Sequence, residues 1–548
     1  MDTPDPQSVR ATAPSSDTPR QRRLPSVPED VLHRYNARVL DPSTAPRNPG
    51  QPMFRSTVYI ADRLILNGGA SPETRQALIA AAERNGAGVI FEDENPDPEK
   101  PRSHVAAALA GLNDQPTLFS TGVRLVAMHV DGQPAVPPDA WQIIQDFRTI
   151  VTRDSANVSA VALDHLIGAT PYVGGVPYVG GVPYVGGVPY VGGVASTQYA
   201  TPGFGGRAPV NWIGAEPTRK SDKELGCRRP VVVTLDTGIG SHPWLDDPNI
   251  VTRELTVQGE TVGIDDTATS PEGTGVVDDP YEGTLDPDAG HGTFIAGLIR
   301  QKCPDANIIG LRVMSSDGAV SESVLLETLK LLVIRQQTAQ AQVPPNAADV
   351  IDVLSFSLGY YHEQPDDVTF DPALLQPIQA LCDCGVAVVA SAGNDSTSRE
   401  FFPAAFAPHD GGQVPACEHD TLPVVSVGAL NPNRTIALFS NAGDWVTCHR
   451  PGAALVSTFP ITFDASGLPL ARVFMPGEGW RETVDPDNFR SGFGTWSGTS
   501  FSAPILAAEL AQAMVSGDCG PIDDVDREAT TERAWQAIEK TVGTVTRP

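Results

Sequence analysis

The sequence predicts an α/β fold, a doubly wound and mostly parallel sheet with helices on both faces, preceded by a small α+β domain. From about residue 228 onward, apolar segments alternate in the order of strands and helices. Strands that are apolar throughout are typical of a parallel sheet covered on both faces. A shorter alternating region occupies residues 53–168, and a unit PYVGGV, written four times over residues 171–194, separates the two regions.

Length and composition exclude several classes of protein. A chain of 548 residues with 41% hydrophobic residues predicts more than one domain, each with a sizeable core. The formal net charge of -28 makes nucleic acid a poor partner, because phosphate recognition needs clustered Lys and Arg. No long apolar run and no secretory signal pattern stands out, so we expect no membrane partner and a cytoplasmic location.

The cysteines predict neither disulfides nor a metal centre. Seven cysteines are an odd number at low density in a chain of this length, which does not indicate a disulfide framework. Cys382 and Cys384 have no matching His/Cys pair nearby. We therefore expect buried thiols at these two positions and assign no metal ligands from the residues alone.

The first half of the chain predicts a tail and a small domain. Residues 1–52 are rich in Pro, Ser and Asp and predict a disordered tail. Residues 53–168 read as strand, helix, strand, strand, helix, strand, which is the ferredoxin-like arrangement. The first helix has clear end signals, with Ser71 as N-cap, Pro72 at the first position and Gly86 as the stop. The strands are STVYIADRLIL, GVIFEDE, GVRLVAMHVDG and NVSAVALDHLI, and the second helix is PPDAWQIIQDFRTI.

The second half predicts the doubly wound sheet. Residues 169–227, which contain the repeat, are assigned to a linker, and residues 228–548 to the second domain. Its alternating segments are PVVVTLD, NIIGLRVM, SVLLETLKLLVI, VIDVLSFSLG, GVAVVASAGN and VVSVGAL. The first of them ends in Asp236. An acid at the carboxyl end of a strand lies at the edge of such a sheet where ligands bind.

Three motifs place an acid, an imidazole and a hydroxyl at the ends of these elements. Asp236 ends its strand, His291 opens an apolar helix in DAGHGTFIAGLI, and Ser500 lies at the turn before a helix in GTWSGTSFSAP. Pro504 is expected in the first turn of that helix, where its missing N–H costs nothing. A serine hydroxyl needs an imidazole to take its proton, and a buried carboxylate fixes the tautomer of that imidazole. A helix N-terminus beneath Ser500 would also stabilise an oxyanion.

At these residues the chain resembles the subtilisin-like serine peptidases, or subtilases. The matching segments are DTGIGSHP, GHGTFIAG, SFSLG, ASAGND and GTSFSAP, all in the order found in that family. The resemblance implies a serine endopeptidase that works through an acyl-enzyme. It implies that Asp236 orients the imidazole, that His291 is the general base and that Ser500 is the nucleophile. Asn394 matches the side-chain donor of the oxyanion hole, which acts together with the backbone N–H of Ser500.

The resemblance also implies a substrate-binding groove. The segment SFSLG resembles the wall of the first specificity pocket, and SDGAV resembles the edge strand that pairs with extended substrate. The substrate-binding residues implied in this way are Gly318, Ser357, Leu358, Gly359, Ser391, Ala392 and Gly393.

Three features depart from the family pattern or offer an alternative. Tyr360 and Tyr361 follow the groove segment where many relatives keep a small residue, so we expect a reshaped groove. Residues 459–492 are longer than in compact relatives and are read either as a lid near the nucleophile or as a surface excursion. His242 is a second candidate base, although the family usually has a structural residue there.

The resemblance gives the N-terminal region a candidate role. Many subtilases carry a β-α-β-β-α-β propeptide that assists folding and inhibits the enzyme, and residues 53–168 resemble such a zymogen module. The alternative is an unrelated α/β interaction domain. The repeat is expected to tether this module, with autoprocessing nearby; its units either lie in the substrate groove or serve as a spacer.

Two expectations follow from the resemblance as a whole. Calcium is implied by the family alone, because no loop of this chain matches the family's ligands. A polypeptide is the expected substrate, and no other cofactor is implied. The alternative function is a subtilase-fold binding or sensing module, in which proteolysis is incidental or restricted to one partner.

Overall fold

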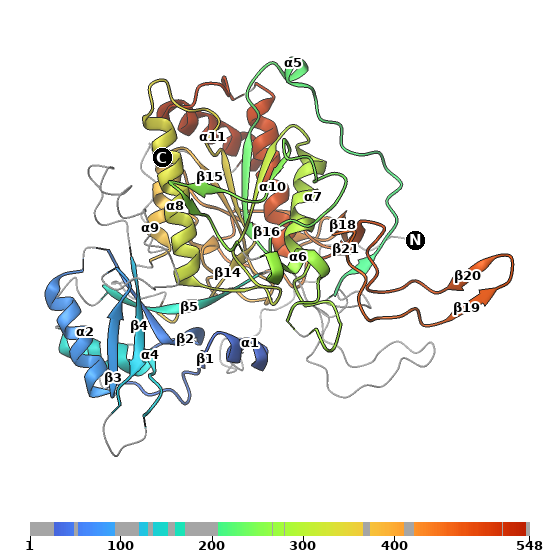
Figure 1. Cartoon of the computed structure of the whole chain (residues 1–548). Helices are drawn as coiled ribbons and strands as arrows, with labels where there is room; N and C mark the ends of the chain where they lie inside the picture. The colour runs from blue at the N-terminus through green and yellow to red at the C-terminus, as the bar shows by residue number, and fades with distance from the viewer. Residues whose placement is uncertain are drawn as a thin grey trace, which may run out of the picture.

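The structure of the chain is a computed structural model, shown in Figure 1. The residues that it describes are 27–48, 53–68, 70–93, 120–129, 135–151, 159–169, 206–265, 267–278, 280–364, 373–409, 421–517 and 519–543. The PYVGGV repeat at 171–194 therefore lies outside the described residues.

The N-terminal unit is an antiparallel sheet covered by two helices. Its strands follow the spatial order β5-β2-β4-β3, and all neighbouring pairs are antiparallel. Apolar side chains of α2 and α4 pack against this sheet and form a core of their own. The elements are β2 (Thr57–Leu66), α2 (Pro72–Arg84), β3 (Ala87–Phe91), β4 (Thr121–Ala127), α4 (Ala140–Ile150) and β5 (Val161–Ala169).

The predicted end signals of the first helix are confirmed. The side chain of Ser71 caps α2 by accepting from the backbone N–H of Thr74, and Pro72 is the first helical residue. Gly86 follows the helix with a φ of 68°, a left-handed conformation that ends the helical path.

The prediction of a disordered tail up to residue 52 is wrong for part of that segment. A short helix, α1 (Glu29–Arg34), and a strand, β1 (Ala37–Leu40), precede β2. β1 pairs antiparallel with β2, and Val31 is buried in a small apolar cluster with Ala319 of the second unit. A segment with few apolar residues is predicted to be disordered because it cannot bury enough apolar surface by itself. Here Ala319 of the second unit, next to the predicted groove residue Gly318, helps to bury Val31.

The second unit contains a parallel sheet of seven strands in the order β17-β16-β15-β13-β7-β11-β8. Every residue of β7, β13 and β15 is buried, as expected for strands covered on both faces. The sheet strands are β7 (Val231–Asp236), β8 (Val251–Thr252), β11 (Asn307–Arg312), β13 (Val353–Phe356), β15 (Ala387–Ser391), β16 (Val425–Leu430) and β17 (Cys448–Pro451).

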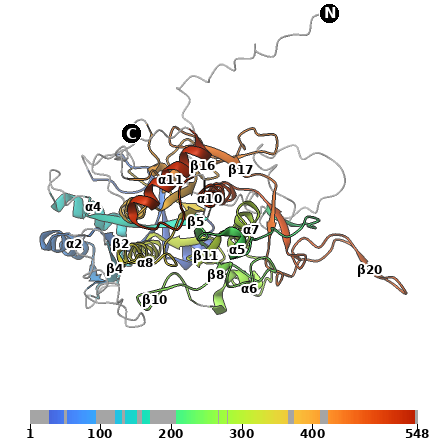
Figure 2. The same cartoon turned by 90° about the horizontal axis from the view of Figure 1, so that it is seen from above.

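Helices cover both faces of this sheet, which confirms the predicted α/β architecture. α7 and α10 pack together on one face, and α8 and α9 pack together on the other (Figures 1 and 2). α9 carries Cys382, and both Cys382 and Cys384 are buried and in no disulfide. The helices are α5 (Asp222–Leu225), α6 (Pro271–Thr274), α7 (His291–Lys302), α8 (Glu322–Ala341), α9 (Leu375–Asp383), α10 (Thr499–Val515) and α11 (Arg527–Val542), with 3-10 turns at Thr267–Thr269 and Ala404–Phe406.

Short strands surround the sheet. β18 (Leu455–Thr458) and β6 (Ala208–Pro209) flank β21 (Phe493–Trp496), and β19 (Arg472–Met475) and β20 (Gly479–Glu482) form a hairpin that projects from the body of the molecule (Figures 1 and 2). The others are β9 (Thr256–Val257), β10 (Glu260–Thr261), β12 (Ala319–Ser321) and β14 (Leu358–Gly359).

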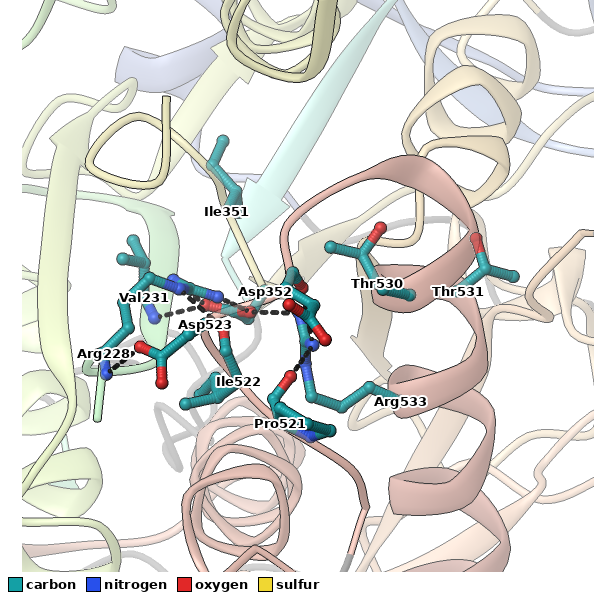
Figure 3. A network of polar contacts seen from close by, with 12 residues as sticks. Arg228, Val231, Ile351, Asp352, Pro521, Ile522, Asp523, Thr530, Thr531 and Arg533 are labelled. Atoms are coloured by element: carbon teal, nitrogen blue, oxygen red, sulfur yellow. Dashed lines mark hydrogen bonds and ion pairs between the residues drawn. The ribbon is translucent and has the colours of Figure 1, made fainter. Parts of the chain in front are cut away.

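A buried ionic network fastens the last helix to the start of the sheet (Figure 3). Asp352 accepts two hydrogen bonds from the guanidinium of Arg228, at 2.9 and 2.6 Å, and one from the backbone N–H of Val231 at 2.8 Å. Arg533 of α11 lies 3.8 Å from the same carboxylate and donates to the carbonyl of Pro521 at 2.8 Å. The network joins residues that are distant in the chain at the amino end of the strands, away from the edge where the candidate site lies.

Among the described helices, none combines the length and the apolar character that crossing a membrane requires.

Candidate active site

Three side chains from three elements meet in one hydrogen-bonded chain. Asp236 ends β7, His291 is the first residue of α7 and Ser500 is the second residue of α10. Nδ1 of His291 lies 2.8 Å from Oδ1 and 3.0 Å from Oδ2 of Asp236, and Nε2 of His291 lies 2.9 Å from Oγ of Ser500. All three residues are at most 1% exposed. The structure therefore brings the three predicted catalytic residues together in hydrogen-bonding order.

The position of Pro504 differs from the prediction. α10 begins at Thr499, so Pro504 lies inside the helix rather than in its first turn. A proline at this position cannot donate to the carbonyl oxygen four residues earlier, which is that of Ser500. The hydroxyl of Ser357 donates to this carbonyl at 2.8 Å instead. The groove segment is thereby tied directly to the backbone of the candidate nucleophile.

Acidic groups surround the imidazole. Burial alone would lower the pKa of His291, but the nearby carboxylates of Asp236, Asp288 and Glu272 raise it above the ordinary value. Burial in turn raises the pKa of Asp288 and of Glu272 to about 7 each. The imidazolium that forms when His291 takes a proton is thus stabilised by more than one carboxylate.

Sequence reasoning missed Glu272. Its carboxylate accepts from the hydroxyl of Thr237 at 2.6 Å and from the backbone N–H of Gly290 at 3.0 Å, and it also contacts the hydroxyl of Thr293. These contacts link the end of β7 to the start of α7. Glu272 lies on a short helix between the first two motifs, and nothing in its local pattern distinguishes it from a solvent-exposed acid.

Asn394 lies next to the start of α10. Its side-chain oxygen accepts from the backbone N–H and the hydroxyl of Thr499, at 3.0 and 2.9 Å, so the amide nitrogen is the donor end of the side chain. The backbone N–H of Gly393 donates to the same hydroxyl at 3.1 Å. Ser391 and Ala392, the other predicted residues of this turn, are fully buried.

Asn441 supports this turn and was also missed. Its side chain donates to the carbonyl of Ala392 at 2.9 Å and accepts from the backbone N–H groups of Asp395 and Thr397 at 3.0 and 3.2 Å. Gly393 has a φ of 95°, and an added Cβ there would lie 2.4 Å from Nδ2 of Asn441. Only glycine therefore fits this turn in its observed conformation.

The two predicted groove segments enclose a strand of the chain itself. β5 pairs antiparallel with β12, which follows Gly318, and with β14, which contains Leu358 and Gly359. The backbone N–H of Ala169 donates to the carbonyl of Gly318 at 2.7 Å. Leu358 lies opposite Ala169 in the ladder, and Ser357, the residue before Leu358, donates to the carbonyl of Ser500. The carboxyl end of β5 thus points toward the candidate nucleophile.

The residues that depart from the family pattern lie beside this groove. Tyr360 is buried and stacks on His165 with ring centroids 4.5 Å apart. The hydroxyl of Tyr361 donates to Asp395 at 2.6 Å.

His242, the second candidate base, is buried. Its Nδ1 accepts from the backbone N–H of Trp244 at 3.1 Å, and burial lowers its pKa to about 4. These contacts give His242 a structural place and not that of the base.

The segment 459–492 has a buried start and an exposed middle. Phe459 is buried and lies against Gly290, where an added Cβ would be 2.7 Å from its ring. The middle of the segment, in contrast, is the projecting hairpin β19–β20, on which Trp480 is 59% exposed. Phe459, at the start of the segment, therefore supports the loop before His291, while the middle of the segment is a surface excursion.

One buried cluster contains residues that could hold a metal ion. His165, His362 and Glu363 each place one ligand atom within 4.8 Å of the others. However, the ring nitrogens of His165 contact Glu322 at 2.6 Å and Glu363 at 2.8 Å, and Nδ1 of His362 accepts from the backbone N–H of Gln364 at 3.0 Å. This geometry fits an imidazolium between two carboxylates. Two of the three candidate ligands are imidazole nitrogens, whereas Ca²⁺ is bound by oxygen ligands. The cluster therefore does not fit the calcium expected from the resemblance.

Comparisons with known proteins agree with this geometry. The model of the Subtilase family matches residues 228–518, just over half of the chain. "Serine protease AprX" of Bacillus subtilis (strain 168) is 25% identical over 320 residues, which cover 54% of this chain and 59% of that protein. "Minor extracellular protease Epr" of the same organism is 26% identical over 198 residues, which cover 34% of this chain and 25% of that protein.

A solved structure shows a weaker likeness. Fervidolysin from Fervidobacterium pennivorans, described as a keratinolytic enzyme related to subtilisin, is 14% identical with a TM-score of 0.43, and the match covers 88% of this chain and 60% of that one. The chain spans less than two thirds of the length of each of these three proteins.

Proposed function

This chain belongs to the subtilase family of subtilisin-like serine peptidases, and we propose that it hydrolyses peptide bonds through an acyl-enzyme on Ser500. The observation that carries the proposal is the hydrogen-bonded chain from Asp236 through His291 to Ser500. Nε2 of His291 takes the hydroxyl proton as Oγ attacks the substrate carbonyl, and Asp236 holds Nδ1–H and stabilises the imidazolium. The imidazolium then returns the proton to the leaving amine.

The developing oxyanion is the second part of the proposed mechanism. The backbone N–H of Ser500 is one donor, because it lies in the first turn of α10, and the side-chain amide of Asn394 is the other. Thr499 holds the oxygen end of this amide, so the donor end is oriented before substrate arrives. His291 then takes a proton from a water molecule, which attacks the acyl-enzyme, and the proton passes to Oγ of Ser500 as the acyl group leaves.

We further infer that the N-terminal unit is a ferredoxin-like propeptide that inhibits the enzyme within the same chain. The support is the strand order β5-β2-β4-β3 around two helices, and the position of β5 between β12 and β14 as an extended peptide would lie. Ile167 of β5 is fully buried in the core of the second unit. In this arrangement the peptidase is a zymogen, and the linker that follows β5 is the place for autoprocessing.

Active-site labelling tests the peptidase proposal. A fluorophosphonate probe should label wild-type protein and not Ser500→Ala, and wild type should cleave a denatured polypeptide that the variant leaves intact. Labelling without cleavage of any polypeptide would favour the alternative, a binding or sensing module. Neither labelling nor cleavage, in a protein that is folded and freed of its N-terminal unit, would overturn the proposal.

Mass spectrometry tests the processing step. A new N-terminus between about residues 168 and 198 should appear in wild type and be absent from Ser500→Ala. Full activity of a chain that stays intact would contradict autoprocessing but leave the peptidase proposal standing.

A further inference from the structure

The hairpin β19–β20 exposes apolar side chains on both of its faces. Every residue of β19 is exposed, and the residues of β20 are exposed or half-buried. Among the residues that the structure describes, no third strand joins these two. Phe474 and Trp480 lie on one face, and Val473 and Met475 lie on the other. A two-stranded hairpin alone is marginally stable in water, and exposed apolar residues gathered in one place mark interaction surfaces.

One face of this hairpin is aromatic and held in a fixed arrangement. Phe474 and Trp480 lie opposite each other in the ladder, with ring centroids 5.4 Å apart at an angle of 68°. The guanidinium of Arg472 lies 4.1 Å from the centroid of the Trp480 ring, and its Nε forms an ion pair with Glu482 at 3.1 Å. Phe474 and Trp480 are nevertheless 55% and 59% exposed. The aromatic face, defined as Arg472, Phe474 and Trp480, is therefore ordered and accessible.

The chain carries an uncharged segment whose chemistry matches this face. Residues 170–205 contain no Asp, Glu, Lys or Arg, in a chain of which 19% of the residues are charged. Within this segment, the PYVGGV repeat places a proline and a tyrosine in every unit of six residues. Aromatic-lined surfaces recognise proline-containing segments, because proline fixes its own backbone and loses little conformational freedom on binding. The repeat therefore offers four equivalent ligands for an aromatic surface.

The uncharged segment ends at the base of the insertion that carries the hairpin. It is followed by β6, which pairs antiparallel with β21, and β21 begins directly after the segment 459–492. The backbone N–H of Val210 donates to the carbonyl of Phe493 at 3.0 Å, and the hydroxyl of Ser491 donates to the carbonyl of Val210 at 3.1 Å. β18 and β21 lie on the side of the molecule from which the hairpin projects (Figure 1).

The length of chain on either side of this base is sufficient for contact. About 14 residues lead from the last repeat unit to β6, and they span up to roughly 45 Å when extended. About 11 residues lead from β20 to β21, and they span up to roughly 35 Å. The repeat can therefore reach the aromatic face from the end of its own segment.

We propose that the aromatic face is a docking site for the PYVGGV repeat of the same chain. The proline ring of one unit packs on the exposed part of the Trp480 indole, and the tyrosine of that unit packs beside Phe474. Any of the four units can occupy the face, because they are identical and share one tether. Docking removes apolar surface of the hairpin from water, and it gives the Tyr and Val residues of the repeat a role that a Gly/Ser spacer cannot have. The inference does not rest on the proposed peptidase function, because it requires no hydrolysis.

Binding of a free peptide is the first test. The protein is the full chain carrying Ser500→Ala, with residues 171–194 replaced by Gly and Ser at equal length. Isothermal titration calorimetry measures the binding of a synthetic peptide of four PYVGGV units. We expect saturable binding that Trp480→Ala weakens roughly 10-fold, the effect of losing one aromatic contact. The matched control Tyr281→Ala, which removes a fully exposed aromatic side chain outside the hairpin, should leave the affinity unchanged.

The same measurement can overturn the inference. A peptide with serine in place of each proline and tyrosine should not bind. No binding of the PYVGGV peptide, equal affinity for the Trp480→Ala chain, or equal affinity of the serine peptide would each contradict docking on the aromatic face.

Hydrogen exchange of the hairpin tests docking within the intact chain. In the full chain carrying Ser500→Ala, the backbone amides of residues 472–482 should exchange several-fold more slowly with the native repeat than with its Gly/Ser replacement. Serine in place of the four prolines and four tyrosines of the repeat should remove this protection, while the hairpin itself keeps its sequence. Protection that persists on about 100-fold dilution would support docking within one chain. Protection that is lost on dilution, together with a dimer in sedimentation, would assign the face to a second copy, and equal exchange in all three chains would show that nothing covers it; either result would overturn the inference.

Discussion

Replacing His165 should release the N-terminal unit from the groove. His165 lies on β5, two residues before Ile167, and is 1% exposed. Its ring nitrogens contact Glu322 at the start of α8 and Glu363, at 2.6 and 2.8 Å. His165→Gln removes the positive charge between two buried carboxylates and leaves at least one of them without its partner.

The magnitude follows from the burial of this cluster. Burial alone would lower the pKa of His165, but Glu322 and Glu363 outweigh it and raise the pKa to about 10. Breaking a buried ion pair by removing one partner costs about 3–5 kcal/mol, which weakens the docked state by roughly 10²–10⁴-fold. Because the pKa is raised, the stabilisation is full below the unfolded value of about 6.5. It is lost as the pH rises toward about 10.

The rate at which a fluorophosphonate labels Ser500 measures this release, because Ser500 is fully buried while β5 is docked. We expect faster labelling of the full-length His165→Gln chain at pH 7 than of wild type, and a difference that narrows toward pH 10. His33→Gln, on the exposed face of α1, is the matched control and should behave as wild type. Equal labelling of His165→Gln and wild type at pH 7, with the fold intact, would refute the reasoning.

Three further outcomes can be checked directly. Asn394→Ala should lower kcat on a peptide by roughly 10²–10³-fold with little change in KM, and a change confined to KM would argue against its oxyanion role. Asp352→Ala, which removes the carboxylate shown in Figure 3, should lower the free energy of unfolding by about 3–5 kcal/mol in denaturant. The exposed control Glu478→Ala should lower it by less than about 1 kcal/mol. Similar losses in both variants would contradict the role of Asp352 in a buried ionic network. Burial raises the pKa of Glu272 to about 7, so the stability linked to its proton is present below about pH 4.5 and is lost toward pH 7. The Tm of wild type relative to Glu272→Gln should therefore be higher at pH 5 than at pH 8, and a difference independent of pH would refute this assignment.

The sequence alone determined the features that depend on neighbouring residues. Ser71 and Pro72 begin α2 because capping and the fixed φ of proline act within one turn. Asp236 and His291 could be placed at the ends of a buried strand and an apolar helix for the same reason. The resemblance of five segments, in order, to the subtilases indicated that these residues form one site.

Only the tertiary structure decided which distant segments meet. Composition assigned α1 to a disordered tail, yet Arg34 docks on Asp317. No pattern marked Glu272 or Asp288 as neighbours of His291, and β5 could not be placed in the groove from its own residues. The physical reason is that local signals act through a few bonds of backbone. Burial, ion pairing and strand pairing between remote segments depend instead on surfaces that exist only once the chain has folded.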